Sequence, residues 1–551
     1  MVTTARDQDI LLKGGLIVDG SGAAPYSANL LIRSGSVTRI APRPVRTTGV
    51  VIDCSRRVIA PGFIDAHSHL DWYIPIKGHD ELKYPFLAQG ITTVVAGACG
   101  LSAAGYREGS AWRDRISETL SGGLLSLQWD TVEELLSRLE ASGASQNMAL
   151  LVGHGSTRTS LRGTDPSPLH PYESKELLYL MERAMDQGAR GVSLGLQYEP
   201  GSYARPEELV EVARLVKRKN KILDVHPRAL APARKMQPTD AVGEAISIAK
   251  ASGVRLQISR VLFTGARAAR HAEEVLEAID AARKSGIDVG LEVTPFHSAA
   301  TVVGAMLPTW FLARGAGAYL DPASVRKLKR ELRAGERQSG MSPSDIQVVN
   351  AIDPELAEHN GRFLTEHARI RRMSPLDALI DISRRSSGQA RILVHHCGTD
   401  RTLEALMRHP ASIFMTDAWV ERFGVQNPAA FGSFPRLLRL ARERKALTLE
   451  DVVRKMTGAT AERFGLSGRG RLAEGLPADI TVFDWEEVSE SAPGPGGAPE
   501  KKNGPADRAA GRASARAPAS PVGIDYVFVN GKKIIGSGKK ENPLNAGVPL
   551  R

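Results

Sequence analysis

The chain has 551 residues, 42% hydrophobic and 24% charged, which is a globular balance that excludes a largely disordered protein. Its three cysteines favour a reducing cytoplasm over a disulfide framework, and neither a signal peptide nor a membrane-spanning apolar run is recognisable. The net charge of +11 is spread widely without an aromatic-and-basic motif, so we expect no nucleic-acid partner and no membrane partner.

The N-terminal segment, residues 1–60, has the pattern of a small β-structure. Short apolar stretches at residues 10–12, 16–18, 30–32 and 50–52 are separated by glycines and other turn-forming residues. Such short separations do not leave room for crossover helices. We therefore predict that residues 1–60 form the first part of a β-domain.

From residue 61 to residue 465 the pattern changes to strands that alternate with longer amphipathic segments. Repeated β-then-α units predict a parallel sheet, and eight of them close into a (β/α)8 barrel. Nine candidate strands are present: 63–66, 92–96, 148–152, 191–194, 222–225, 255–258, 289–293, 391–394 and 413–415. One of the last four therefore lies outside the barrel or belongs to a long insertion near 308–389, and the pattern does not distinguish these possibilities.

The C-terminal segment, residues 466–551, returns to β-structure. Apolar runs at 480–483, 526–529 and 534–535 predict strands that complete the β-domain. Between them, residues 489–521 are rich in Ala, Pro, Gly, Ser, Arg and Lys, a composition that predicts a disordered surface loop. The whole pattern predicts a (β/α)8 barrel with a small β-sandwich domain built from both chain ends.

The strongest chemical signal is a His-x-His pair at the end of the first barrel strand. Side chains two residues apart on a strand point the same way, so His67 and His69 can offer two imidazole nitrogens to one divalent metal ion. Alone, the pair could equally be two solvated histidines. Further candidate ligands at later strand ends favour the metal site, because the carboxyl ends of barrel strands share one mouth.

Those later strand ends carry several metal-binding or charged side chains. They are Cys99, His154, Ser193, His226, Arg260, His297, His395, His396 and Asp417. Soft and borderline ligands in this arrangement are typical of zinc. Asp417 follows an apolar strand and can act as a general base beside a metal-bound water, although a helix N-cap is the alternative interpretation.

Nearly the whole chain resembles the amidohydrolase superfamily and, within it, the N-acyl-D-amino-acid deacylase group. The matching motifs are residues 61–69, 90–100, 188–201, 431–438 and 470–484. The resemblance implies a zinc-dependent barrel with one or two ions that hydrolyses an amide. It places His67 and His69 in one half of the metal site, Cys99 and His226 in the other, tighter half, and Asp417 as the general base.

The chain departs from this group at the site itself. Arg260 stands where the group has a ligand histidine, and a guanidinium has no lone pair to offer. Leu262 and Phe296 replace a lysine and a tyrosine, and Ala98 replaces a common asparagine.

Three accounts of the missing ligand remain open. His297, His395 or His396 supplies a substitute; or the ion moves toward His67, His69 and Asp417, with Cys99 or His226 assisting; or the metal is absent and Arg260 serves as an electrostatic clamp. We favour a retained metal, because the other ligand types survive.

The resulting hypothesis is a metal-dependent hydrolase of a non-peptide C–N bond in a small-molecule amide. An N-acyl amino acid of the D series is the favoured substrate, with Arg228 and Arg260 as candidate carboxylate-binding residues. A cyclic amide or imide hydrolase or cyclase is one alternative, and a metal-poor, non-catalytic binding protein is the other. The sequence gives no indication of the oligomeric state.

Overall fold

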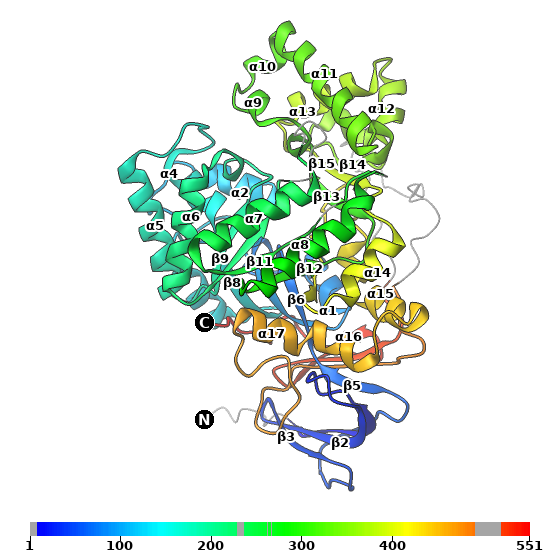
Figure 1. The fold of residues 1–551 in the computed structure, drawn as a ribbon. Coiled ribbons are helices and arrows are strands. Elements are labelled where there is room, and N and C mark those ends of the chain that lie inside the picture. Colours follow the sequence, from blue (N-terminus) through cyan, green and yellow to red (C-terminus); the bar gives the residue numbers. More distant parts are fainter. Residues whose placement is uncertain (1–7, 229–235, 262, 266, 491–519) are drawn as a thin grey trace.

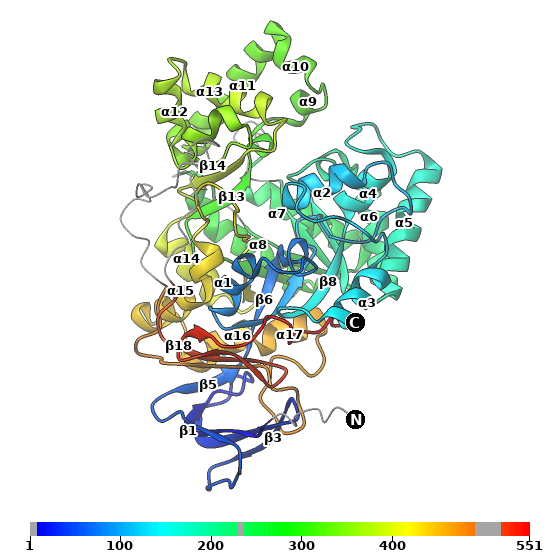
Figure 2. The same cartoon turned by 180° about the vertical axis from the view of Figure 1, so that it is seen from behind.

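The computed structural model describes residues 8–228, 236–261, 263–265, 267–490 and 520–551. Three parts lie one above another along the long axis of the molecule (Figure 1). The barrel lies in the middle, a helical insertion with a small sheet lies above it, and a β-domain lies below it. The view from behind shows the same order, with helices α2, α4 and α5 beside the barrel (Figure 2).

The central part confirms the predicted (β/α)8 barrel. Its strands are β6 (Phe63–Ser68), β7 (Ile91–Ala96), β8 (Asn147–Gly153), β9 (Gly191–Gly195), β10 (Ile222–His226), β11 (Arg255–Ile258), β12 (Val289–Val293) and β16 (Ser412–Phe414). Neighbouring strands pair in parallel from β6 through to β16. Between the first and last strands, the Asp417 amide donates to the His67 carbonyl at 3.1 Å, so the barrel is nearly closed.

The ninth candidate strand lies outside the barrel. It is β15 (Arg391–His395), which pairs antiparallel with both β13 (Ser298–Val302) and β14 (Ile346–Asn350). These strands and helices α9 to α13 form the insertion, which has a hydrophobic core of its own. The insertion therefore begins with β13, earlier than the predicted residue 308, because an apolar strand follows β12 after a short turn.

Strands from both ends of the chain form the β-domain, as the sequence predicts. They are β1 (Ile10–Ile17), β2 (Tyr26–Arg33), β3 (Ser36–Ala41), β4 (Val50–Asp53), β5 (Val58–Pro61), β17 (Ile480–Phe483), β18 (Ile524–Val529), β19 (Lys532–Gly536) and β20 (Lys539–Lys540). Within the described residues they are hydrogen-bonded as one sheet, in which β17 joins β5 to β18. Most of the predicted disordered loop, 491–519, lies outside the described residues.

Amphipathic helices cover the barrel and build the insertion. They are α1 (Tyr84–Leu87), α2 (Arg113–Ser121), α3 (Val132–Ser142), α4 (His154–Arg162), α5 (Pro171–Asp186), α6 (Pro206–Arg218), α7 (Pro238–Ser252), α8 (Ala272–Lys284), α9 (Thr309–Leu312), α10 (Gly317–Leu320), α11 (Pro322–Ser339), α12 (Leu364–Ile370), α13 (Pro375–Arg385), α14 (Asp400–Arg408), α15 (Ala429–Arg444), α16 (Leu449–Met456) and α17 (Gly458–Phe464). In α6, Leu209, Val212 and Val216 are buried at helical spacing. Proline in its first turn and basic residues in its last turn suit the two helix ends.

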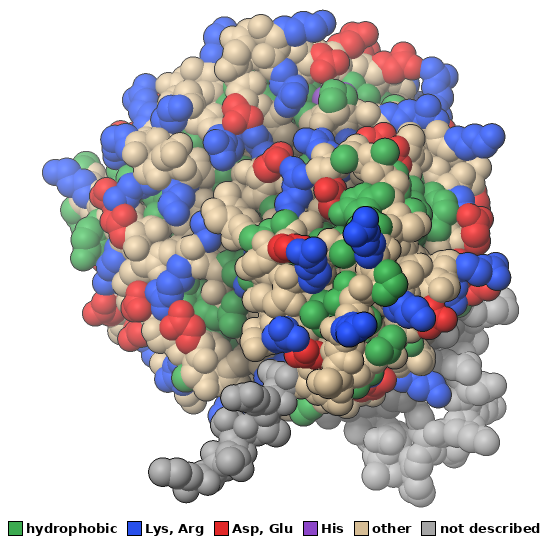
Figure 3. All heavy atoms as spheres, turned by 90° about the horizontal axis from the view of Figure 1, so that it is seen from below, with side chains coloured by type: hydrophobic (Ala, Val, Ile, Leu, Met, Phe, Trp, Pro, Cys, Tyr) green, Lys and Arg blue, Asp and Glu red, His purple; other side chains and the backbone are tan. Residues whose placement is uncertain are grey.

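The surface carries its basic side chains among acidic ones. On the face seen from below, Lys and Arg side chains lie scattered among Asp and Glu side chains, with neutral and hydrophobic surface between them (Figure 3). Intermixed charges of this kind are typical of a solvated surface rather than of a polyanion-binding patch. Among the described helices, none combines the length and apolar character needed to cross a membrane.

Candidate metal centre

The barrel brings the predicted metal ligands together at its mouth. His67 belongs to β6 and His226 ends β10, while Cys99 follows β7 and Asp417 follows β16. All four side chains and that of His69 are buried. Residues far apart in sequence thus meet at the carboxyl ends of the strands, where barrels carry their active sites.

The donor atoms lie at distances that suit one metal ion. Single donor atoms of His67, His69, Cys99 and Asp417 all lie within 4.8 Å of one another. The Cys99 Sγ is 3.2 Å from the His67 Nε2. The Asp417 Oδ1 is 3.6 Å from that nitrogen and 3.4 Å from the His69 Nε2. Ligand atoms of a tetrahedral zinc ion are about 3.3–3.7 Å apart, so this donor set fits zinc.

His226 offers a fifth donor on the other side of the thiol. Its Nδ1 lies 3.1 Å from the Cys99 Sγ. Of the predicted ligands, His67, His69 and Cys99 belong to the group of donors within 4.8 Å of one another, whereas His226 adjoins this group through the Cys99 sulfur. A thiolate there contacts imidazole nitrogens from two different strands, β6 and β10.

Burial keeps the imidazoles of the cluster in the neutral state that a metal site requires. It lowers the pKa of His67 to about 4 and the pKa values of His69 and His226 well below the usual range. The three imidazoles are therefore neutral at pH 7, with lone pairs available for a cation. Burial also raises the pKa of the Cys99 thiol, so metal binding must release its proton.

Three residues of this region have left-handed backbone angles directly after barrel strands. The φ angles are +56° for Cys99, +56° for Arg260 and +47° for Asp417. None is glycine, and each such conformation costs on the order of 1–3 kcal/mol. Strained backbone of this kind concentrates at functional sites, and here it coincides with the cluster.

Two buried carboxyl groups behind His67 could not be assigned from the sequence. The Glu292 Oε2 lies 3.0 Å from the His67 Nδ1, and the Asp224 Oδ2 lies 3.9 Å from it. With Nδ1 donating to Glu292, the His67 Nε2 keeps its lone pair toward Cys99 and Asp417. The available signal is an acidic residue inside each of two otherwise apolar strands, β10 and β12.

Arg260 extends its guanidinium into the cluster. Its Nη1 contacts the Asp417 Oδ2, and its Nη2 donates to the Ser298 carbonyl at 3.2 Å. The side chain is only 4% exposed, so this is a buried ion pair. The two oxygens of Asp417 therefore face different partners: Oδ1 faces the histidine pair and Oδ2 faces the guanidinium.

The proposed substitute ligands have other partners. His297 contacts Asp400 at 2.9 Å, His395 contacts Gln347 at 3.0 Å, and His396 contacts Asp345 at 2.8 Å. None of these three histidines belongs to a metal-suited group of donors among the described residues.

The two residues proposed to bind a substrate carboxylate are both engaged in this structure. The Arg228 Nε lies 3.0 Å from both Glu244 carboxylate oxygens, and its Nη1 donates to the Ser202 carbonyl at 2.8 Å. Arg260 is paired with Asp417. Phe296 packs under the Arg436 guanidinium, and residue 262 lies outside the described residues.

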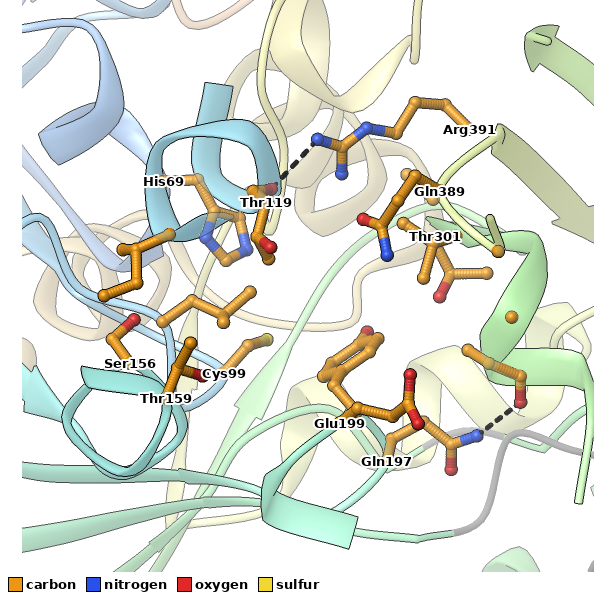
Figure 4. Close-up of a pocket in the computed structure, with 18 of the residues that line it drawn as sticks. His69, Cys99, Thr119, Ser156, Thr159, Gln197, Glu199, Thr301, Gln389 and Arg391 are labelled. Carbon is orange, nitrogen blue, oxygen red and sulfur yellow. Dashed lines mark hydrogen bonds between the residues drawn. The ribbon is translucent and has the colours of Figure 1, made fainter. Parts of the chain in front are cut away.

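A pocket opens beside the donor cluster, between the barrel mouth and the insertion. His69 and Cys99 lie on one side of it, and Thr301, Gln389 and Arg391 lie on the other (Figure 4). Its wall also includes Trp72, Trp419, Leu101, Ile116 and Tyr198. Asp417 lines the same pocket, so a small molecule there can reach both the metal ligands and the carboxylate.

Comparison with known proteins finds similarity over nearly the whole chain. The sequence profile of the Amidohydrolase family matches residues 50–534. A D-aminoacylase from Alcaligenes xylosoxydans xylosoxydans is 29% identical over 523 residues, covering 94% of this chain and 95% of the relative. An N-acyl-D-glutamate deacylase from the same organism is 28% identical, covering 95% and 93% of the two chains.

Solved structures of similar proteins share the fold of this chain over nearly its whole length. The N-acyl-D-glutamate deacylase of Bordetella bronchiseptica, complexed with zinc and a phosphonate inhibitor, has a TM-score of 0.78 at 26% identity, covering 99% of both chains. A D-aminoacylase has a TM-score of 0.77 at 25% identity, covering 98% of this chain and 99% of its own. That enzyme has a binuclear metal centre with one-metal activation and second-metal attenuation.

Proposed function

The chain belongs to the amidohydrolase family, and from that premise we propose that it hydrolyses small N-acyl-D-amino acids with a single zinc ion. The observation that carries the proposal is the group of four buried donors, His67, His69, Cys99 and Asp417, within 4.8 Å of one another. Two relatives that cover 94% and 95% of this chain are named D-aminoacylase and N-acyl-D-glutamate deacylase, which supports the substrate class.

The proposal of one ion rests on Arg260. A second cation beside Asp417 would need the Oδ2 atom that the guanidinium contacts. Two cations in direct contact in a buried site repel strongly, because little solvent screens them. Arg260 thus takes the role of a permanent second charge, while the imidazole and thiol donors remain available for one ion. Because His67, His69, Cys99 and Asp417 still offer four donors to one ion, the metal-free binding protein is the weaker alternative.

Zinc held by these residues would polarise the scissile carbonyl and lower the pKa of a bound water. The residues of the chain then perform the proton transfer. Asp417 accepts the proton of the attacking water and delivers it to the amide nitrogen as the C–N bond breaks. The products are a carboxylic acid and a free amine. The carboxylate suits this role when His67, His69 and Cys99 hold the ion, because its Oδ1 then remains free beside the histidine pair, whereas Oδ2 is paired with Arg260.

Arg260 also provides electrostatic stabilisation. Its charge contributes to the lowered pKa values of His67, His69 and His226 and so favours neutral, ligating imidazoles. A fixed positive charge near the carbonyl oxygen also favours the negative charge that develops during attack on an amide.

A matched substrate panel tests the proposed function. We expect hydrolysis of N-acetyl-D-amino acids, slower or absent hydrolysis of the L enantiomers, loss of activity after metal removal, and recovery with zinc. The measurement is amine release before and after chelation, with the chelator removed by dialysis. Activity that is undiminished in metal-free protein, or turnover of no D substrate by zinc-loaded protein, would contradict the proposal.

A further inference from the structure

Arg391 places a positive charge in the pocket, and neither of the carboxylates that line this pocket, Glu199 and Asp417, forms an ion pair with it in the described structure. It is the first residue of β15, in the insertion, and its Nη2 donates to the Thr119 carbonyl at 3.2 Å (Figure 4). Within the described residues, no carboxylate oxygen lies within 4.0 Å of a guanidinium nitrogen of Arg391, which is the limit for an ion pair. By contrast, Arg115, which lines the same pocket, is 3.8 Å from Glu118.

Two tryptophans hold the Arg391 guanidinium close to the donor cluster. Its Cζ lies 5.1 Å from the ring centre of Trp419 and 5.9 Å from that of Trp72. The Trp72 ring in turn lies 4.5 Å from the His69 ring. Contact with aromatic faces leaves the N–H edge of a guanidinium free to bind an anion. One aromatic ring therefore separates this cation from a candidate metal ligand.

A buried N–H without a partner in the described part of the chain belongs to the same part of the pocket lining. Trp72 is 1% exposed, and its Nε1 has no hydrogen-bond partner among the described residues. A buried N–H without a partner costs free energy, so such groups are usually matched by a ligand or water. Trp72 lines the same pocket as Arg391. The neighbouring Trp419 is already satisfied, because its Nε1 donates to Glu421 at 2.5 Å.

The charge of Arg391 affects the pKa values of two titratable groups near Trp72 and Trp419. It contributes to the lowered pKa of His69, after burial and the effect of His67. It also opposes the burial that raises the pKa of Glu421. Glu421 is not within ion-pair distance of Arg391, so a bound anion could still approach the guanidinium directly.

We propose that Arg391 is the residue that binds the carboxylate of the substrate. This inference rests on the proposed function and names the part of the substrate that the insertion recognises. A guanidinium binds a carboxylate through two parallel hydrogen bonds. In an N-acyl α-amino acid, the carboxylate carbon is three bonds from the scissile carbonyl carbon, which suits a cation one ring away from His69. Leu101, Ile116 and the tryptophans then favour an apolar side chain or acyl group.

The test compares a carboxylate substrate with its neutral counterpart. N-acetyl-D-leucine and its primary carboxamide differ in the charge that Arg391 would bind. We expect the parent to prefer the carboxylate in kcat/KM by about tenfold to a hundredfold, the range of a charged hydrogen-bonded pair. Arg391→Met should abolish the preference, mainly through KM, and Arg391→Lys should retain part of it, because the charge remains without the planar fork.

Arg422→Met is the matched control. Arg422 also lies over an aromatic ring, with its Cζ 5.4 Å from the centre of Phe423, but it does not line the pocket of Asp417. This variant should keep the parent preference. Equal preference in the parent and in Arg391→Met would overturn the role of Arg391 while the proposed function stands.

Calorimetric measurement of the binding of the same two compounds distinguishes a failure of the proposed function from a failure of the Arg391 proposal. If zinc-loaded parent hydrolyses neither compound, the proposed function fails. Selective binding of the carboxylate that is lost in Arg391→Met would then still support an anion site at Arg391. Binding of both compounds with equal affinity by the parent and by Arg391→Met would contradict it.

Discussion

Replacing Asp417 with asparagine is expected to lower kcat by about 10²–10⁴-fold, the usual contribution of a general acid–base residue. The amide keeps the size of the side chain and an oxygen that can face His67 and His69, but it cannot accept the proton of water. KM should change little, because Asp417 is proposed to act in the proton transfer. The measurement is steady-state hydrolysis of N-acetyl-D-leucine by zinc-loaded protein.

The Asp417→Asn variant is also expected to lose stability, because Asp417 is paired with Arg260. Asp417→Asn removes the countercharge of a buried guanidinium, and breaking one side of a buried ion pair costs about 3–5 kcal/mol. Thermal unfolding should therefore show a lower Tm. The double variant Arg260→Met/Asp417→Asn should regain much of that stability without regaining activity. Parent-like kcat in a folded, zinc-loaded Asp417→Asn protein would refute the assigned role of Asp417.

Replacing Cys99 with alanine is expected to weaken zinc binding by at least about 100-fold, more than the loss of a second-shell partner costs. The Cys99 sulfur lies between His67 and His226, at 3.2 and 3.1 Å from their ring nitrogens. Without it, the donors from β6 and β10 lose their common neighbour and the site loses its anionic sulfur ligand. Competition with a chromophoric chelator measures the zinc affinity directly.

Cys54→Ala provides the control for the loss of a buried thiol. Cys54 is a buried free cysteine in the core of the β-domain, away from the donor cluster. Its replacement should leave zinc affinity at the parent value and lower the free energy of unfolding only modestly. Parent-like zinc affinity in Cys99→Ala would show that Cys99 is not a ligand.

The sequence was sufficient to predict most of the barrel, because each barrel strand is a short apolar run followed by an amphipathic segment. It could not exclude residues 391–394, because β15 has the same apolar pattern as a barrel strand. Only its antiparallel partners, β13 and β14, show that it belongs to the insertion. The predicted start of the insertion near residue 308 was wrong for a related reason. The sequence gives no indication that β13 pairs with β15 rather than with a barrel strand.

At the candidate site, too, some features could be predicted from the sequence and others could not. The proximity of His67, His69, Cys99 and Asp417 could be predicted, since each of them lies at or just after the carboxyl end of a barrel strand. The ion pair of Arg260 with Asp417 could not be predicted, because it depends on the distance between the ends of β11 and β16 across the barrel mouth. Arg391 and the tryptophans were missed because a strand start in an insertion gives no indication of which pocket it lines.

In the proposed centre, the chain holds one metal ion while Arg260 occupies the place of a second cation. The most direct test is elemental analysis of zinc per chain, in protein purified without chelators and equilibrated with zinc, for the parent and for Arg260→His. Histidine supplies a lone pair and frees the Asp417 Oδ2, so we expect about one zinc in the parent and a second in the variant. A parent without zinc, with metal bound only by Arg260→His, would show that Arg260 has displaced the ion and would refute the proposed one-ion centre.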